Sequence, residues 1–408
     1  MENLPTFSRG KLIFSSAAPE EPPSKHKPLD LIDLLSIAQH HLVDFLPITW
    51  HEALGPLGEG GSAHVSQSHV DLKASFAFKR FVRRENRREK ALQYIAAEIR
   101  VLRSESLRSH PNIVSLLGVC WEFCAERKSI APVLVFPKAP LGDIHTFLVG
   151  GDGRSIPFTT KLSLCVDVAM AMMTLHNTSK CLRRVGLCSS ILTSIPYIIH
   201  GDIKPQNILV FRDDRENPLA KLIDFAYSCF GADINSRVYL PRTSPWILAP
   251  EWHPRGFSLA AAKRLDVFSY GMLCVWILFQ QEISNIFGKS GENCVEDLLH
   301  DLKAQRQILH AVQVIIQDLD LEDEERRAQL GEFFSMTIAD DPKSRECDFG
   351  RLIHYLNPQR HTSSSDNVTA VPHAPVSATQ PTLLKEYKFP TLHSHFSFSV
   401  SDNLELLK

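Results

Sequence analysis

The chain has 408 residues, which is enough for one large or two moderate domains with a buried core. Its formal net charge of -2 excludes a nucleic-acid binder that relies on bulk positive charge. Nine cysteines without a Cys-x-x-Cys pair indicate a reduced intracellular protein. The amino terminus lacks a secretory signal, and the most apolar stretch, Gly271 to Phe279, is too short to span a bilayer. We therefore expect a cytoplasmic or nuclear protein that binds neither nucleic acid nor membrane.

The amino-terminal region divides into a leader and a helical extension. Residues 1–28 are rich in Pro, Ser and charge, which is typical of a flexible leader. Apolar residues at 31, 35, 38, 42 and 45 fall on one helical face, so we predict a helical extension over 29–47. It is expected to cover the domain that follows, with partner binding through 29–46 as the alternative.

The remaining chain changes pattern twice. Short β-type runs occupy about 48–137, with a helical segment at 91–102, and helical patterns follow at 162–175, 265–280, 295–312 and 324–336. This order predicts an α+β fold, with a small β-rich half and a larger, mainly helical half separated by a cleft. Residues 358–408 carry no periodic apolar face and are predicted to be disordered, with docking of their phenylalanines as the alternative.

The most informative run is His-Gly-Asp-Ile-Lys-Pro-Gln-Asn-Ile-Leu at 200–209, followed by Asp224 in Leu-Ile-Asp-Phe. Asp202 can orient and deprotonate a hydroxyl, and Lys204 can neutralise a migrating phosphoryl group. Asn207 and Asp224 offer the oxygen ligands that Mg²⁺ prefers. These residues predict phosphoryl transfer from Mg-ATP, and at this point the chain resembles the eukaryotic protein kinases.

The resemblance extends to a glycine-rich segment, Leu57-Gly58-Glu59-Gly60-Gly61-Ser62-Ala63-His64-Val65. Glycines at 58 and 60 would let a hairpin lie close over phosphates, with backbone N–H groups facing the anion. The resemblance implies that Leu57 and Val65 cover the nucleotide. Alone the motif is a weak signal, and Ala63 replaces the usual third glycine.

Two further segments complete the expected nucleotide site. Alternation puts Ala77 and Lys79 on one side of a strand, Ala77 against the base and Lys79 toward the phosphates, and Glu98 on the next helix can pair with Lys79. The resemblance makes 134–142 the hinge between two lobes, with Phe136 as gatekeeper. It also implies that Leu209 and the backbone of residues 137 and 139, Pro137 and Ala139, bind the nucleotide.

The same resemblance implies a kinase domain at 48–357, with a small lobe at 48–137, a large lobe at 141–357 and an insert at 177–196 that could contact a partner. Lys204-Pro205 is similar to the serine/threonine kinases, and the protein substrate remains unknown. Glu251, in Ala-Pro-Glu, is expected to pair with Arg345, and Asp266 to support the catalytic loop.

Three departures qualify the resemblance. Gly201 stands where most protein kinases have Arg, which makes activation through a phosphate on the activation segment doubtful. Ala226 replaces the Gly of Asp-Phe-Gly, and Ser244 replaces a bridging Thr. A pseudokinase that acts as a nucleotide-binding scaffold therefore stays open as one alternative. A small-molecule phosphotransferase, which shares the His-Gly-Asp run, stays open as another.

Overall fold

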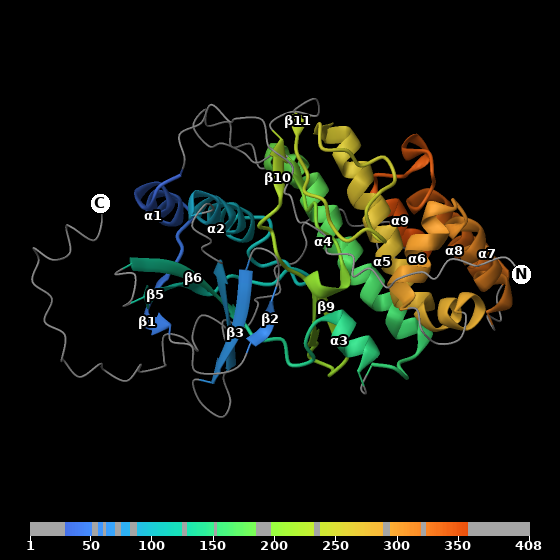
Figure 1. Cartoon of the computed structure of the whole chain (residues 1–408), viewed down its shortest axis with the longest axis horizontal. Helices are drawn as coiled ribbons and strands as arrows, with labels where there is room; N and C mark the ends of the chain where they lie inside the picture. Colours follow the sequence, from blue (N-terminus) through green and yellow to red (C-terminus); the bar gives the residue numbers. More distant parts are fainter. Residues whose placement is uncertain are drawn as a thin grey trace, which may run out of the picture.

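A computed structural model describes residues 29–50, 56–59, 63–69, 75–81, 88–124, 129–150, 153–184, 197–231, 237–288, 294–319 and 324–357. The predicted leader (1–28), Gly60, residues 185–196 of the predicted insert and the predicted tail (358–408) lie outside these ranges. In Figure 1 a β-sheet with two helices beside it occupies one end of the molecule, and helices fill the other end. This confirms the predicted α+β architecture.

The sheet has six strands in the order β1-β5-β6-β4-β3-β2. They are β1 (Phe45–Trp50), β2 (Pro56–Glu59), β3 (Ala63–His69), β4 (Ser75–Phe81), β5 (Gly118–Cys124) and β6 (Ser129–Pro137). Strand β1 runs parallel to β5, and the other pairs are antiparallel. The antiparallel register places Lys79 between Val65 on β3 and Leu134 on β6, so the predicted nucleotide-binding strands are neighbours.

The amino-terminal extension is shorter than predicted. Helix α1 covers only Leu31–His40, starting at a capping box between Asp30 and Asp33. Leu42 then adopts a left-handed φ of 51°, which stops the helix, and the chain continues as strand β1. The prediction of a helix over 29–47 is therefore wrong beyond residue 40, because pairing with β5 prevails over the helical periodicity.

Helix α1 lies beside helix α2 (Arg88–Leu102), the helix that carries Glu98 (Figure 1). Leu34 and Ala38 of α1 are buried in the same apolar core as Ile95 and Ile99 of α2. The expected contact of this extension with the domain is thus present.

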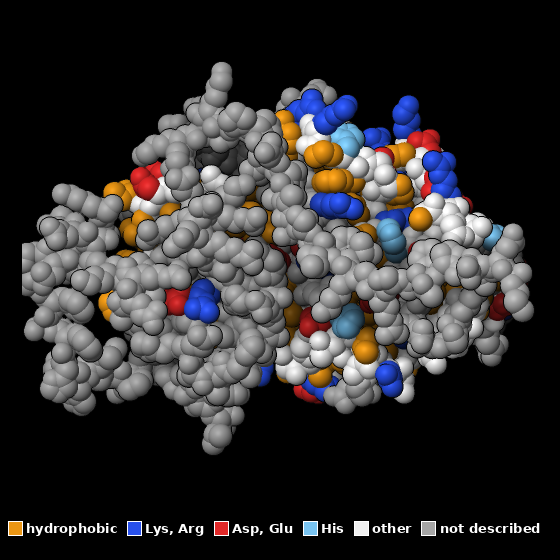
Figure 2. Space-filling model, in the orientation of Figure 1, with side chains coloured by type: hydrophobic (Ala, Val, Ile, Leu, Met, Phe, Trp, Pro, Cys, Tyr) orange, Lys and Arg blue, Asp and Glu red, His pale blue; other side chains and the backbone are white. Residues whose placement is uncertain are grey.

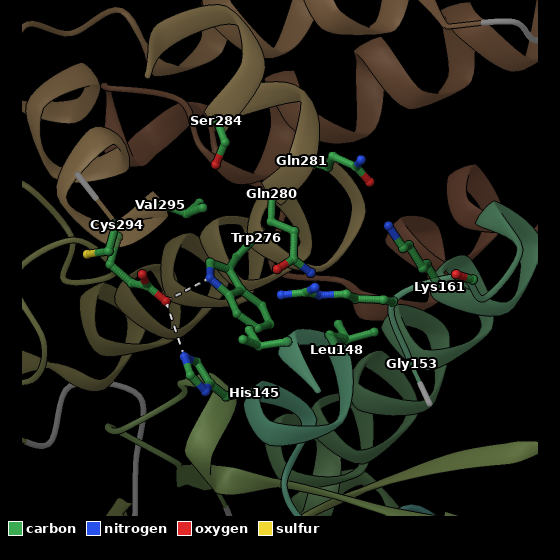
Figure 3. A pocket seen from close by; sticks show the side chains of 14 residues that line it. His145, Leu148, Gly153, Lys161, Trp276, Gln280, Gln281, Ser284, Cys294 and Val295 are labelled. Carbon is green, nitrogen blue, oxygen red and sulfur yellow. Dashed lines mark hydrogen bonds and ion pairs between the residues drawn. The ribbon is translucent and has the colours of Figure 1, made fainter. Parts of the chain in front are cut away.

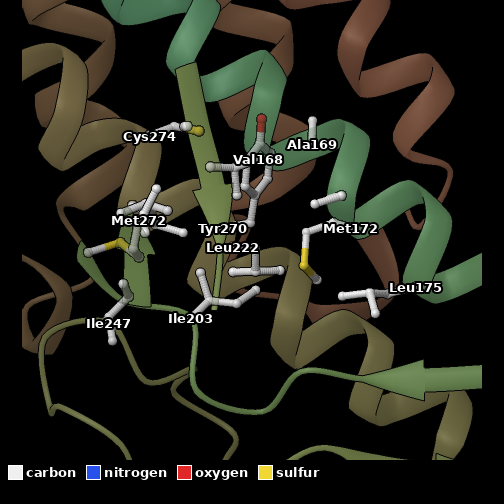
Figure 4. Close-up of a cluster of buried hydrophobic side chains, with 14 of the residues drawn as sticks. Val168, Ala169, Met172, Leu175, Ile203, Leu222, Ile247, Tyr270, Met272 and Cys274 are labelled. Atoms are coloured by element: carbon white, nitrogen blue, oxygen red, sulfur yellow. The ribbon is translucent and has the colours of Figure 1, made fainter. Parts of the chain in front are cut away.

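The helical half is built around two long helices, α4 (Phe158–Arg184) and α5 (Leu259–Phe287). Around them lie α3 (Ile144–Val149), α6 (Val295–Ala304), α7 (Ile308–Asp318), α8 (Glu324–Thr337) and α9 (Phe349–Leu356). Figure 4 shows apolar side chains from α4 and α5 meeting Leu222 and Ile203, which belongs to the 200–209 run. Tyr270 donates a hydrogen bond from its buried hydroxyl to the carbonyl of Cys165 (3.0 Å), which ties α5 to α4.

Two predicted segments of this half differ in the structure. Helix α4 runs through Arg184, so the first part of the predicted insert continues that helix. Residues 295–312 form two helices because Arg306 adopts a left-handed φ of 57° between them. Within the described residues, one segment, Phe158–Asn177, is long and apolar enough to span a bilayer, but 56% of its most apolar window is buried in the fold, as in a core helix.

Short strand pairs hold the loops where the two halves meet. They are β7 (Tyr197–Ile199) with β10 (Cys229–Gly231), β8 (Ile208–Arg212) with β9 (Pro218–Leu222), and β11 (Arg237–Val238) with β12 (Phe257–Ser258). A short 3₁₀ helix, Pro205–Asn207, leads into β8. The run 200–209 and the segment after Asp224 are therefore fixed at both ends by β-pairing.

Candidate active site

Lys79 stands between two carboxylates. Its Nζ lies 2.9 and 2.8 Å from the two oxygens of Glu98 and 2.8 Å from Oδ1 of Asp224. Lys79 is only 6% exposed and Glu98 only 1% exposed, so little solvent screens these contacts. The predicted pair between β4 and α2 is present, and Asp224 is joined to it.

The pKa values of Lys79, Glu98 and Asp224 are linked because a single ammonium forms ion pairs with both carboxylates. Burial disfavours the charge of Lys79, but attraction by Asp224 and Glu98 outweighs it and raises the pKa of the ammonium. For Glu98 burial dominates over the attraction of Lys79, and with repulsion by Asp224 it raises the pKa to about 7. Burial acts on Asp224 as well, but the attraction of Lys79 prevails and lowers its pKa. Glu98, the more buried of the two acids, therefore binds a proton more readily than Asp224.

Asp202 is held by its own loop. Lys204 Nζ donates to Oδ2 of Asp202 at 2.7 Å. The Nδ2 amide of Asn207 donates to the Asp202 carbonyl (2.7 Å) and to the same Oδ2 (3.1 Å). Burial raises the pKa of Asp202, although Lys204 opposes the shift, so this carboxylate is a stronger base than an exposed one.

His200 and Asp266 fix the backbone beneath Asp202. The backbone N–H groups of His200 and Gly201 donate to the Asp266 carboxylate at 2.8 and 3.0 Å. The Asp202 N–H donates to Nδ1 of His200 (3.2 Å), so Nε2 carries the ring proton and donates to the Ile223 carbonyl (3.0 Å). The expected support by Asp266 is confirmed, and the same network positions the residue before Asp224.

Asn207 and Asp224 fit a hard divalent cation. The Nδ2 group of Asn207 is occupied by Asp202, which leaves Oδ1 as the atom available to a metal. Oδ1 of Asp224 accepts from Lys79 and from the Ala226 N–H, and within the described part of the chain Oδ2 has no hydrogen-bond donor. Among the described residues, no three His, Cys, Asp or Glu side chains form a metal site. A magnesium ion held by one carboxylate, one amide and substrate phosphates requires no such group.

Most of the other predicted nucleotide-binding residues lie on strands that pair with one another or follow the hinge. Gly58 pairs with Val65 across β2 and β3, and Leu57 lies on β2. Ala77 pairs with Phe136 across β4 and β6, and both side chains are buried. Pro137 ends β6, Ala139 follows it, and Leu209 on β8 bridges to Asp143 just after the hinge. Strand pairing thus joins Ala77 on β4 to Phe136 at the start of the hinge, the two segments expected to contact the base.

Comparison with known proteins decides what this arrangement is. The family model of the protein kinase domain matches residues 51–349. The chain belongs to the protein kinase family. That match begins near the predicted domain start and ends at Phe349, the first residue of α9.

Its relatives include plant and amoebal kinases. A wall-associated receptor kinase-like protein of Arabidopsis thaliana is 30% identical over 54% of this chain and 27% of its own length. The salt tolerance receptor-like cytoplasmic kinase 1 of Oryza sativa is 34% identical over 43% of this chain and 44% of its own. A probable serine/threonine-protein kinase of Dictyostelium discoideum is 22% identical over 81% of this chain and 52% of its own. The chain thus spans about half or less of these relatives.

The structure shows the surroundings of two residues that depart from the kinase pattern, Gly201 and Ser244. Gly201 has a left-handed φ of +77°, and a Cβ there would lie 3.0 Å from Leu240 and 3.3 Å from the Tyr227 carbonyl. Glycine suits both this backbone and this close approach. Ser244 makes no described hydrogen bond to Asp202 or Lys204, so the bridge suggested by its position is absent within the described residues.

Sequence reasoning missed two positions that bear on this kinase site. Asp167 of α4 accepts a hydrogen bond from the Ala220 N–H (3.0 Å), which anchors β9 ahead of Asp224. Its signal was a carboxylate in an otherwise apolar helical stretch. Lys303 of α6 donates to the carbonyls of Pro245 and Leu248, just before Ala-Pro-Glu. A lysine on an amphipathic helix carries no sequence signal for such a contact.

A separate cavity of about 650 Å³ lies between α3, the start of α4, the end of α5 and the start of α6 (Figure 3). Trp276 lines the cavity, stacks on His145 and donates its indole N–H to Glu296 at 2.9 Å. None of the predicted site residues lines it. It is therefore distinct from the group around Lys79 and Asp202.

Proposed function

We propose that the chain is a serine/threonine protein kinase that transfers the γ-phosphate of Mg-ATP to hydroxyl groups of protein substrates. The observation that supports this most directly is the assembly of six side chains, which we call the polar cluster. It consists of two hydrogen-bonded groups, Lys79 with Glu98 and Asp224 (2.8–2.9 Å) and Asp202 with Lys204 and Asn207 (2.7–3.1 Å). The N–H of Ile223, the residue before Asp224, donates to the Asn207 carbonyl at 3.0 Å and connects the two groups through the backbone.

Each member of the polar cluster has a chemical task in this proposal. Lys79, held by Glu98, positions the α- and β-phosphates, while Asn207 and Asp224 would hold Mg²⁺, which would neutralise phosphate charge when bound. Asp202 orients the acceptor hydroxyl and takes its proton as the new P–O bond forms and ADP leaves. Lys204 offers positive charge beside the transferred group.

The protein substrate, the cellular location and the partners are further proposals. The serine/threonine assignment rests on Lys204-Pro205 and on a relative that is named as a probable serine/threonine kinase. Substrate binding is assigned to the described part of the activation segment, 237–251, which follows β10 and ends at Glu251. A cytoplasmic or nuclear location is proposed because the irregular set of nine cysteines is typical of a reduced intracellular protein.

The test is transfer of labelled γ-phosphate to a mixed protein substrate, with wild type beside Asp202→Asn. Removal of the base should lower transfer about 10²- to 10⁴-fold. Binding of Mg-ATP, measured by calorimetry, should persist because Asn207 and Asp224 are unchanged. Label on Ser or Thr that disappears in the variant is the expected result.

Absence of transfer from folded wild type that binds Mg-ATP would contradict the proposal. The alternative favoured then is a nucleotide-binding scaffold, which Ala226 and the unbridged Ser244 support. Transfer to small hydroxyl compounds but not to protein would instead favour a small-molecule phosphotransferase.

A further inference from the structure

The activation segment passes directly over Gly201. Leu240 Cδ2 lies 3.0 Å from the point where a Cβ of residue 201 would stand, and Pro241 Cδ lies 4.0 Å from it. Residue 201 therefore contributes no charged side chain to this segment, and apolar atoms fill the adjacent space. Residues 244–248, at the carboxyl-terminal end of the segment proposed to bind substrate, are called the substrate-facing turn, and side chains of α5 and α6 contact this turn.

That end of the segment is held by its main-chain carbonyls. The N–H groups of Ile247 and Leu248 bond to the Ser244 carbonyl at 3.2 and 3.1 Å, which closes a turn. The outward carbonyls of the same turn are bound by two helices. Ser269 Oγ of α5 donates to the Ile247 carbonyl at 3.1 Å. Lys303 Nζ of α6 donates to the Pro245 carbonyl and, at 2.6 Å, to the Leu248 carbonyl.

Lys303 is partly buried, and its ammonium lies against the carbonyls of this turn. Within the described part of the chain, no carboxylate lies at ion-pair distance from its Nζ, so carbonyl oxygens are its acceptors. Burial lowers the pKa of Lys303 to about 8, and the more distant charge of Glu251 opposes the shift. An exposed lysine would hydrate its charge instead. Here the charge is directed at two carbonyls of residues 245 and 248.

We propose that Lys303 is a positioning residue that holds the substrate-facing turn 244–248 in place without a phosphate on the activation segment. The inference rests on the proposed function, because the turn matters only if a protein substrate binds there. It names the side chain of α6 that holds the substrate-facing turn. It also explains how the segment can be ordered although residue 201 is glycine.

The test compares Lys303→Met, which keeps the aliphatic stem, with Lys303→Arg, which keeps the positive charge. Lys343→Met, on an exposed lysine, is the matched control. Loss of charge-assisted hydrogen bonds should lower kcat/KM for the protein substrate about ten- to a hundredfold in Lys303→Met. Affinity for Mg-ATP should stay within about twofold, since the polar cluster is unchanged. Lys303→Arg should recover most of the loss.

Hydrogen exchange gives a second readout that does not require enzyme activity. The Ile247 and Leu248 amides should exchange about tenfold faster or more in Lys303→Met, while those in the middle of α5 should be unaffected. Phosphatase treatment of wild type should leave these two amides protected. Loss of protection after phosphatase would overturn the inference, because a phosphate would then be ordering the turn.

Two other outcomes would also overturn it. One is wild-type kinetics and wild-type exchange in Lys303→Met. The other is an equal loss of ATP affinity and melting temperature in the Met and Arg variants, which would show general structural support. If wild type transfers no phosphate to protein, the proposed function fails by itself, and the exchange data alone decide whether Lys303 anchors the turn.

Discussion

The pairing of Lys79 with two acids gives the site an internal electrostatic imbalance. One ammonium lies within 2.8–2.9 Å of both Glu98 and Asp224, so the three groups together carry one negative charge when all are ionised. In a buried setting that excess charge is costly, and a proton on Glu98 relieves it. The state of the Lys79–Glu98 pair should therefore depend on pH near neutrality.

We predict that the Glu98 carboxyl of the nucleotide-free protein titrates near pH 7 rather than near 4.5. Between these values the folded state binds the proton more tightly than the unfolded state. The stability that this proton contributes is therefore lost as the pH rises through 7. A carbon-13 NMR titration of labelled glutamate side chains, assigned with Glu98→Gln, measures the pKa directly.

The Asp224→Asn variant is the control for this titration. It removes the like charge and leaves Lys79 to Glu98 alone, so the pKa of Glu98 should move down. A Glu98 resonance that titrates near 4.5 in wild type, or that ignores the Asp224 substitution, would contradict the electrostatic account.

At the scale of elements, the amino-terminal extension is attached to the helix that carries Glu98. Just after α2, Arg103 donates from Nε to the His41 carbonyl (3.4 Å) and from its guanidinium to the Leu42 carbonyl. The Asp44 carbonyl accepts from the Val119 N–H at 2.9 Å, which continues the attachment into the sheet. Helix α1 is thus fastened at its carboxyl end to α2 and to β5.

We predict that Arg103→Ala loosens α1 and weakens the placement of α2. Loss of a guanidinium bound to two carbonyls should lower the free energy of unfolding by about 1 to 2 kcal/mol, given partial exposure. Hydrogen exchange of residues 31–46 should rise more than exchange of α5. Arg108→Ala, on an exposed arginine of the following turn, should leave both quantities unchanged. Equal effects of the two substitutions would rule out a specific attachment.

Element boundaries show where sequence periodicity is insufficient. The apolar spacing of 29–46 is truly helical only to His40, because Leu42 turns left-handed and the next residues join a sheet. The run 295–312 has one continuous pattern but breaks at Arg306 for a similar reason. The first break accompanies pairing with β5, a tertiary contact that a local pattern does not encode, whereas the second is a local turn between two helices.

At the scale of the whole molecule, the site was easier to predict than the boundaries. Asp202, Asn207 and Asp224 lie in short motifs whose spacing reflects fixed loops, and the Lys79–Glu98 contact needs only a strand and the next helix. The contact of Lys303 with residues 245 and 248 was not predictable, since it joins chain positions 55 or more apart without a motif. Residues of a family's recurring motifs can be predicted from sequence, whereas individual long-range contacts such as that of Lys303 cannot.

The pair of Glu251 and Arg345 joins positions 94 residues apart, as predicted. The Arg345 guanidinium donates to both Glu251 oxygens, at 2.6 and 3.1 Å, and also to the Ala339 carbonyl. It lies over the Phe268 ring, 4.6 Å from its centroid, and is only 4% exposed. This single side chain therefore connects the end of the activation segment to α5 and to the loop after α8.

We predict that Glu251→Gln destabilises the whole helical half, because it leaves a buried guanidinium without a counter-charge. Breaking a buried pair costs about 3 to 5 kcal/mol, and the partial exposure of Glu251 reduces the expectation to about 2 to 3 kcal/mol. Urea unfolding should show a lower midpoint with an unchanged slope. Glu324→Gln, in an exposed pair with Arg327, should cost well under about 1 kcal/mol. If both substitutions cost equally little, the connection through Arg345 would not be a structural one.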